Sequence, residues 1–187
     1  MKKFAVIILI LSSLAAYAQT SNNVERQLFK INALVPGVSY ELGLSNNLTL
    51  NLDALLIPGG GRGLNNKTQF GVLPGFQADL RYFVNMKRRS GKGKNISGNS
   101  GNFVALMNQL YSGNAILGNL KLDNGFNYIT ALSYGIQRTR PKGFYWGFSV
   151  GPGLYFGDID PQFTVFIDLK LGWVLRGKKY FNTLKIN

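Results

Sequence analysis

The chain has 187 residues, which is the length of a single domain. Its 21 lysines and arginines outnumber its 8 aspartates and glutamates, and the resulting formal charge of +13 favours an anionic partner such as nucleic acid, phospholipid or lipopolysaccharide. Cysteine and histidine are both absent. Their absence excludes disulfides, thiolate metal sites and every mechanism that needs an imidazole.

The N-terminus has the pattern of a secretory signal. Lys2 and Lys3 precede an apolar run over residues 4–14, and Ala16, Tyr17 and Ala18 follow as a small-residue cleavage pattern. The run is too short for a transmembrane helix, which needs roughly 20 apolar residues. We therefore predict a cleavable signal peptide over residues 1–18 and a short N-terminal segment over 19–27. Export takes the protein away from nucleic acid, so that partner is disfavoured.

Apolar and polar side chains alternate with a period of two through most of the remaining chain, which predicts β-strands. In residues 72–85, for example, Phe76 and Leu80 lie on one face and Asp79 and Arg81 on the other. The same pattern covers residues 48–56, 126–136, 144–156 and 163–173. Turn signals separate the strands at 45–47, 59–63, 88–101, 112–125, 141–143 and 158–161.

The number of strands depends on residues 28–44. Two strands separated by Pro36 and Gly37 complete a set of eight, whereas one long bent strand is the alternative; an even number favours the division. Apolar and polar side chains alternate poorly in residues 103–111. A β-bulge or a short helical turn is therefore an alternative to a regular strand there. The fold predicted is all-β, an antiparallel up-and-down transmembrane β-barrel of eight strands over residues 28–175, followed by a basic C-terminal tail over 176–187.

The charges of the strands gather on one face, while the other face is almost free of charge. This division favours a lipid-facing exterior around a polar interior, although a soluble lipocalin-like barrel with aromatic core packing remains an alternative. An eight-stranded barrel is just wide enough inside for its own side chains, which argues against a general porin. We predict a charge network in the lumen, made of Lys30, Glu41, Asp53, Asp79, Arg81, Asp168 and Lys170.

Basic residues are clustered between strands and after the last strand. With eight strands and both termini on the periplasmic side, all these clusters face the periplasm. We predict a basic periplasmic rim of Lys87, Arg88, Arg89, Lys92, Lys94, Arg138, Arg140, Lys142, Arg176, Lys178 and Lys179. Solvation with control of topology is the favoured interpretation of this rim, and contact with anionic phospholipid or cell-wall polymer is the alternative.

We find no pattern for catalysis. The glycine runs at 59–63 and 91–94 lack the Lys-Ser/Thr of a phosphate loop. Barrel hydrolases of the Ser-His or Asp-His type need an imidazole to move the proton, and the chain has none. We therefore predict that the protein is not an enzyme and holds no cofactor and no metal ion.

Four passages carry a resemblance to a known family: FKIN at 29–32, PGVSYE at 36–41, DLRYFVN at 79–85 and NSGNF at 99–103. With them, nearly the whole mature chain resembles the small eight-stranded outer-membrane β-barrel proteins of Gram-negative bacteria. The resemblance implies residence in the bacterial outer membrane, contact with its lipid and lipopolysaccharide, and insertion by the barrel-insertion machinery. It implies no particular activity or protein partner. The function expected is a structural or interaction role, with a narrow transport pore as the alternative.

Overall fold

The computed structural model describes residues 23–62, 68–157 and 160–178, so the predicted signal peptide and residues 179–187 of the predicted tail lie outside it. The described part is all-β, as predicted. Its elements are β1 (Gln27–Asn32), β2 (Gly37–Gly43), β3 (Leu48–Arg62), β4 (Thr68–Phe83), α2 (Met86–Gly91), β5 (Asn102–Asn114), β6 (Leu117–Gly118), β7 (Lys121–Thr139), the 3₁₀ turn η1 (Pro141–Gly143), β8 (Phe144–Phe156) and β9 (Gln162–Lys178).

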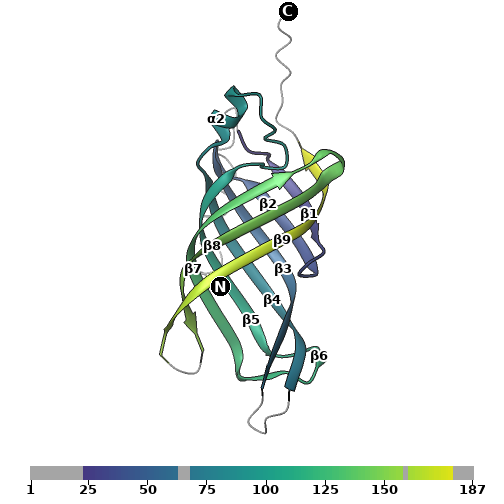
Figure 1. The fold of residues 1–187 in the computed structure, drawn as a ribbon, viewed down its shortest axis with the longest axis vertical. Coiled ribbons are helices and arrows are strands. Elements are labelled where there is room, and N and C mark those ends of the chain that lie inside the picture. Colours follow the sequence, from purple (N-terminus) through teal and green to yellow (C-terminus); the bar gives the residue numbers. More distant parts are fainter. Residues whose placement is uncertain (1–22, 63–67, 158–159, 179–187) are drawn as a thin grey trace, which may run out of the picture.

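The strands form one antiparallel sheet that returns to its starting point. Its order is β3-β2-β1-β9-β8-β7-β5-β4, and β4 pairs again with β3, so these eight strands make a ring (Figure 1). The short β6 pairs with β4 beside this ring. Residues 28–44 are two strands, because β1 and β2 pair antiparallel with Ile31 opposite Val38. The division at Pro36 and Gly37 is therefore confirmed.

Several strands differ from the sequence prediction. The glycine run at 59–63 was predicted to be a turn, but β3 continues through it as far as Arg62, with Gly59 opposite Gly71. The ladder between β3 and β4 provides hydrogen-bond partners for the backbone of these residues. Residues 103–111 lie within the continuous β5, and the irregularity falls later, between Ser112 and Asn114. At the C-terminal end β9 reaches Lys178, so residues 176–178 of the predicted tail belong to the strand. The helix α2 lies within the connection predicted to be a loop.

β1 and β2 are much shorter than their neighbours. β2 pairs with β3 only between Thr49 and Leu55, and β1 pairs with β9 only between Gly172 and Lys178. Among the described strands, residues 57–62 of β3 and 162–170 of β9 consequently pair on one side alone, with β4 and β8. The eight-stranded ring is thus complete only in the half of the molecule that carries α2 (Figure 1).

The interior of the ring holds two small apolar clusters beside many buried polar residues. One cluster lies next to α2 and contains Val24, Phe83, Met86, Phe103 and Ala105. The other contains Met107, Ala131 and Phe166. Neither α2 nor η1, the helices of the described residues, has the length and apolar character to span a membrane.

Candidate functional site

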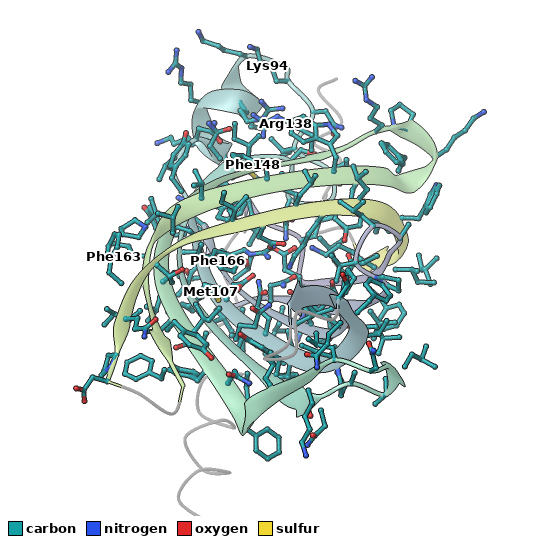
Figure 2. All side chains as sticks on the ribbon, turned by 60° about the horizontal axis from the view of Figure 1, so that its bottom comes forward. Lys94, Met107, Arg138, Phe148, Phe163 and Phe166 are labelled. Carbon is teal, nitrogen blue, oxygen red and sulfur yellow. The ribbon has the colours of Figure 1, made fainter. Side chains whose placement is uncertain are left out.

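Alternate residues of each strand point into the ring, which fixes the position of the predicted charged residues. On β4, Gln77, Asp79 and Arg81 are buried, whereas Phe76, Leu80 and Tyr82 are exposed. Figure 2 shows the same contrast elsewhere: Met107 and Phe166 lie inside, and Phe163 points away from the ring. The structure brings together all seven residues of the predicted charge network, from β1, β2, β3, β4 and β9.

The first part of the network surrounds Glu41 on β2. Lys30 Nζ on β1 lies 2.7 Å from Glu41 Oε2. Arg81 Nη1 on β4 lies 4.0 Å from the same oxygen, and the Arg81 guanidinium also pairs with Asp79. The side chains of these four residues are at most 4% exposed. Burial makes each pair necessary, because an unpaired charge away from water costs several kcal/mol.

The second part surrounds Lys170 on β9. Its ammonium pairs with Asp53 on β3 and lies 3.9 Å from Asp79 Oδ2 and 3.4 Å from Asp168 Oδ2. Asp79 thus faces both Arg81 and Lys170 and joins the two parts into one network. In the ring β1 and β2 lie between β9 and β3. The Lys170–Asp53 pair consequently connects strands that do not pair with each other.

Neutral side chains also join this network, and Gln137 on β7 is the most connected of them. Its Oε1 accepts hydrogen bonds from Arg81 Nη1 at 3.2 Å and Lys30 Nζ at 3.4 Å, and its Nε2 donates to Glu41 Oε2 at 3.3 Å. Thr49 Oγ1 donates to Glu41 Oε1 at 2.9 Å. Gln137 is not among the residues predicted for the lumen. Its inward position on β7 would have identified it had the strand been extended beyond residue 136.

The connection between β4 and β5, residues 84–101, is fastened to this network and is here named the end cap. Asn99 Nδ2 donates to Glu41 Oε1 at 2.9 Å, while the backbone N–H of Glu25 donates to Asn99 Oδ1 at 2.7 Å. Glu25 Oε1 in turn accepts from the Gly98 N–H at 2.6 Å. Ile96 packs on the apolar cluster next to α2. The end cap is therefore held by polar and apolar contacts at once.

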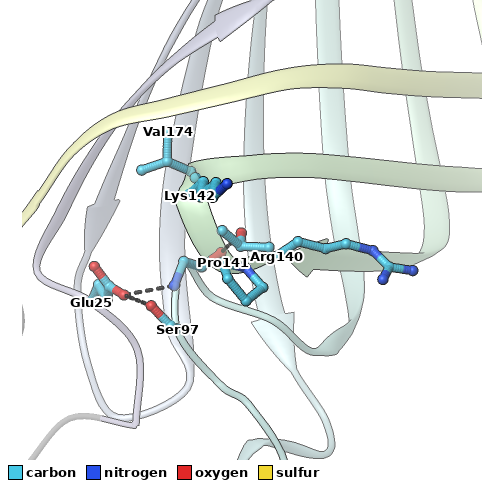
Figure 3. A pocket seen from close by; sticks show the side chains of 9 residues that line it. Glu25, Ser97, Arg140, Pro141, Lys142 and Val174 are labelled. Atoms are coloured by element: carbon cyan, nitrogen blue, oxygen red, sulfur yellow. Dashed lines mark hydrogen bonds between the residues drawn. The ribbon is translucent and has the colours of Figure 1, made fainter.

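A pocket of about 290 Å³ lies beside the end cap, between Glu25 and η1 (Figure 3). Glu25 Oε1 also accepts from Ser97 Oγ at 3.3 Å. In Figure 3, Arg140 extends away from Glu25. The residues that line the pocket are Glu25, Ser97, Gly98, Thr139, Arg140, Pro141, Lys142, Gly143 and Val174. The Ser97 hydroxyl lies beside the Glu25 carboxylate, but no imidazole is present to act as a general base. The arrangement therefore fits a hydrogen bond that stabilises the structure better than an activated nucleophile.

The residues of the predicted basic rim lie at the end of the ring that carries α2. Lys87, Arg88 and Arg89 are on α2, Lys92 and Lys94 follow it, and Lys94 and Arg138 lie on the same side in Figure 2. Arg140 and Lys142 belong to the β7–β8 turn. Arg176 and Lys178 lie in the last residues of β9, opposite the start of β1. Lys179 lies outside the described residues.

Within the described ranges, no group of three or more acidic side chains is arranged to hold a metal ion. No family model, curated protein or solved structure matches the chain. The inner and outer surfaces of the ring differ in physical character, the inner being polar and charged and the outer apolar.

Proposed function

We propose that the protein is a small outer-membrane β-barrel with a side-chain-filled polar lumen, and that it has a structural or interaction role without catalysis. The observation that supports this proposal is the inverted distribution of its residues. Lys30, Glu41 and Asp53 are each at most 1% exposed inside the ring, whereas Leu132 is 60% and Ile167 64% exposed outside it. Water-soluble folds have the opposite arrangement.

The outer face is apolar over all the long strands. One row of leucines runs across four strands through the pairs Leu50–Leu80, Leu80–Leu106 and Leu106–Leu132. Soluble monomers rarely expose apolar patches larger than a few hundred Å². In a bilayer the same surface is stable where the ring is complete, because lipid chains cover it and the ladder hydrogen bonds satisfy the backbone. Residues 57–62 of β3 and 162–170 of β9, which pair on one side alone, lie outside that part.

Exposed aromatic residues lie towards both ends of the ring, as expected for the interfacial girdles of transmembrane barrels. Tyr82, Tyr134 and Trp173 lie on the half that carries α2. Phe70, Phe126 and Phe163 lie near the opposite ends of the same strands. A soluble lipocalin-like barrel would instead keep its large aromatic residues inside, around the ligand.

Fractionation of a Gram-negative host that expresses the full chain tests this proposal. The expected result is recovery in the outer membrane, extraction only with detergent, and a gel band whose migration changes on heating. N-terminal sequencing should find a mature chain that begins at Gln19. Recovery of the mature chain in the soluble periplasm without detergent would refute the proposal.

A further inference from the structure

Two arginines lie near each other on the α2 half of the molecule, Arg89 on α2 and Arg138 on β7. Arg138 occupies an outward position opposite Trp146, between the inward residues Gln137 and Thr139. Its Nη1 donates to the carbonyls of Gly101 and Gln137, each at 2.7 Å, and its Nη2 donates to Asn102 Oδ1 at 2.6 Å, which leaves its Nε hydrogen and the second Nη2 hydrogen for a ligand. These bonds hold the Arg138 guanidinium against the outer wall.

Arg89 approaches this position from the end cap. Its Nη2 donates to the Asn95 carbonyl at 2.8 Å, while its Nε is buried without a hydrogen-bond partner among the described residues. Asn95 Nδ2 in turn donates to the Thr139 carbonyl at 2.8 Å, which holds Arg89 beside β7, next to Arg138, where the two positive charges repel each other. In the part of the chain that the structure describes, neither forms an ion pair with a carboxylate. An anion beside both would remove this repulsion and accept hydrogen bonds from them.

The surroundings of this pair combine positive charge with an apolar wall. The exposed basic side chains at the same end of the ring are Lys87, Arg88, Lys92, Lys94, Arg140 and Lys142. Glu25, the carboxylate that hydrogen-bonds to the end cap, is buried and already accepts from the Gly98 N–H. On the β7 side, Tyr134 lies on the same outward face as Arg138 and accepts from Asn102 Nδ2 at 2.6 Å. Further along this face, Leu132 is 60% exposed.

We infer that Arg89 and Arg138 bind the phosphate group of an anionic phospholipid, with the neighbouring basic residues adding long-range attraction. The inference rests on the proposed function. In a membrane-spanning barrel, the level at which the apolar outer face of the strands meets the basic residues of the α2 end is that of the lipid headgroups. A guanidinium binds phosphate through paired N–H donors, which an ammonium does not offer. The acyl chains then lie along Tyr134 and Leu132, a contact that free phosphate lacks.

Trp146 provides a reporter, because it is paired with Arg138 in the register of β7 and β8. The chain has only 2 tryptophans, so Trp173→Phe leaves Trp146 as the sole source of tryptophan fluorescence. The Trp173→Phe protein is reconstituted in vesicles that contain brominated phosphatidylglycerol or brominated phosphatidylcholine at the same mole fraction. Bromine quenches Trp146 on contact, so the ratio of the two quenching curves measures the preference for the anionic lipid.

We expect phosphatidylglycerol to be preferred about tenfold, the size of effect that charge-assisted hydrogen bonds produce. Arg89→Gln combined with Arg138→Gln should abolish the preference. Arg140→Gln combined with Lys142→Gln removes the same charge but leaves Arg89 and Arg138 unchanged. This variant should keep most of the preference for phosphatidylglycerol. Heat-modifiability on a gel verifies that each variant is folded, and Arg138→Lys provides a milder substitution that should weaken the preference while keeping the charge.

Several results would overturn the inference. Equal quenching by the two lipids in the Trp173→Phe protein would show that the site has no selectivity, while leaving the barrel proposal intact. An equal loss in the Arg140/Lys142 variant would indicate diffuse attraction in place of a site. Removal of the preference by excess glycerol phosphate would mean that the site takes free phosphate. Absence of quenching by either lipid would refute membrane insertion, and the inference with it.

Discussion

At the scale of single residues, Leu80 tests which face of the ring meets lipid. It lies in the middle of the outward leucine row, between Leu50 and Leu106. Leu80→Arg should lower the free energy of unfolding in bilayers by about 2 to 4 kcal/mol at the membrane midplane and by less near an interface, since the charge would face hydrocarbon. Leu80→Met is the matched control and should cost much less. Equal stability of the two variants in lipid would show that the faces are assigned wrongly.

Gly135 tests the packing inside the ring. A Cβ atom there would lie 2.3 Å from Phe103 Cζ and 2.8 Å from the Cβ of Ser149. The Phe103 ring packs on Phe83 with centroids 5.5 Å apart, so its movement disturbs the apolar cluster next to α2. Gly135→Ala should therefore destabilise the protein by about 1 to 3 kcal/mol, which is the usual cost of overpacking.

Gly147 supplies the control, because it is also an inward glycine, on the neighbouring β8. Its nearest neighbours would be 3.6 Å from an added Cβ, an ordinary contact distance. Gly147→Ala should leave the midpoint of denaturant unfolding nearly unchanged. If both alanine variants unfold at the same denaturant concentration, the close contact of Gly135 with Phe103 does not exist in solution.

The charged residues of the interior were predictable from the sequence for a local reason. Alternation in one strand assigns Asp79 and Arg81 to the same face, and it does the same for Asp168 and Lys170. Which carboxylate meets which cation was not predictable, because Lys170 reaches Asp53 from 117 positions away in the chain. Asn99 was missed for the same reason: nothing in its neighbourhood of small polar residues indicates a bond to Glu41.

At the scale of elements, the end cap depends on Asn99, which has a positive φ of 55° and hydrogen bonds to both Glu25 and Glu41. Asn99→Gly keeps this backbone conformation accessible and removes both side-chain bonds. The loss should cost about 1 to 3 kcal/mol, since it leaves buried groups without partners. Faster amide hydrogen exchange in residues 86–98, compared with β7, is the expected readout. Unchanged exchange there would mean that the apolar contacts of Met86 and Ile96 suffice.

Element boundaries were less predictable than element type, and β5 illustrates why. Its inward residues Phe103, Ala105 and Met107 are apolar like its outward ones, so the period of two disappears although the strand is regular. The glycine run of β3, in contrast, was predicted to be a turn although it belongs to a strand. Glycine is typical of turns, yet here Gly59 and Gly71 face each other beneath Leu120, whose Cδ2 would lie 2.9 Å from a Cβ at Gly59.

At the scale of the whole molecule, closure of the ring depends on the pairing of β1 with β9. Ile31 is opposite Trp173 in this register, and both side chains are exposed on the outside. Because the chain has no cysteine, Ile31→Cys with Trp173→Cys introduces a single possible disulfide. Directly opposed Cβ atoms lie about 4.5 to 5.5 Å apart, close to the distance that a disulfide requires. Oxidation in the membrane should give a crosslinked chain with altered migration on a non-reducing denaturing gel.

The matched control is Ile31→Cys with Leu169→Cys, in which the second cysteine lies further along the same outward face of β9. At about 3.4 Å per residue, this shift puts the two thiols beyond bonding distance. A crosslink of equal yield in both pairs would indicate that β1 has no fixed register on β9, and that the ring is not closed as described.

The reconstituted protein should form no stable open pore for solutes of sugar size. The Lys170–Asp53 pair connects β9 with β3, and Gln137 on β7 hydrogen-bonds to Lys30 and Arg81 from β1 and β4. The bore of an eight-stranded barrel is filled by such side chains, and separating the pairs to open it would leave buried charges alone.

The weak part of this blockade is the wall of β8 and β9 at Gly147, where the nearest atom to an added Cβ would lie 3.6 Å away. At Gly151, Gly153 and Gly172, backbone atoms of the neighbouring strands already occupy that space. The side chain of Asp168 is 18% exposed there, more than that of any other residue in the charge network. A narrow ion path along this wall is the alternative to a closed bore. Planar-bilayer recording, with a sugar-permeable porin as the positive control, distinguishes the two. Steady, large single-channel steps, or swelling of liposomes in small sugars, would contradict the filled-lumen interpretation and make transport the leading function.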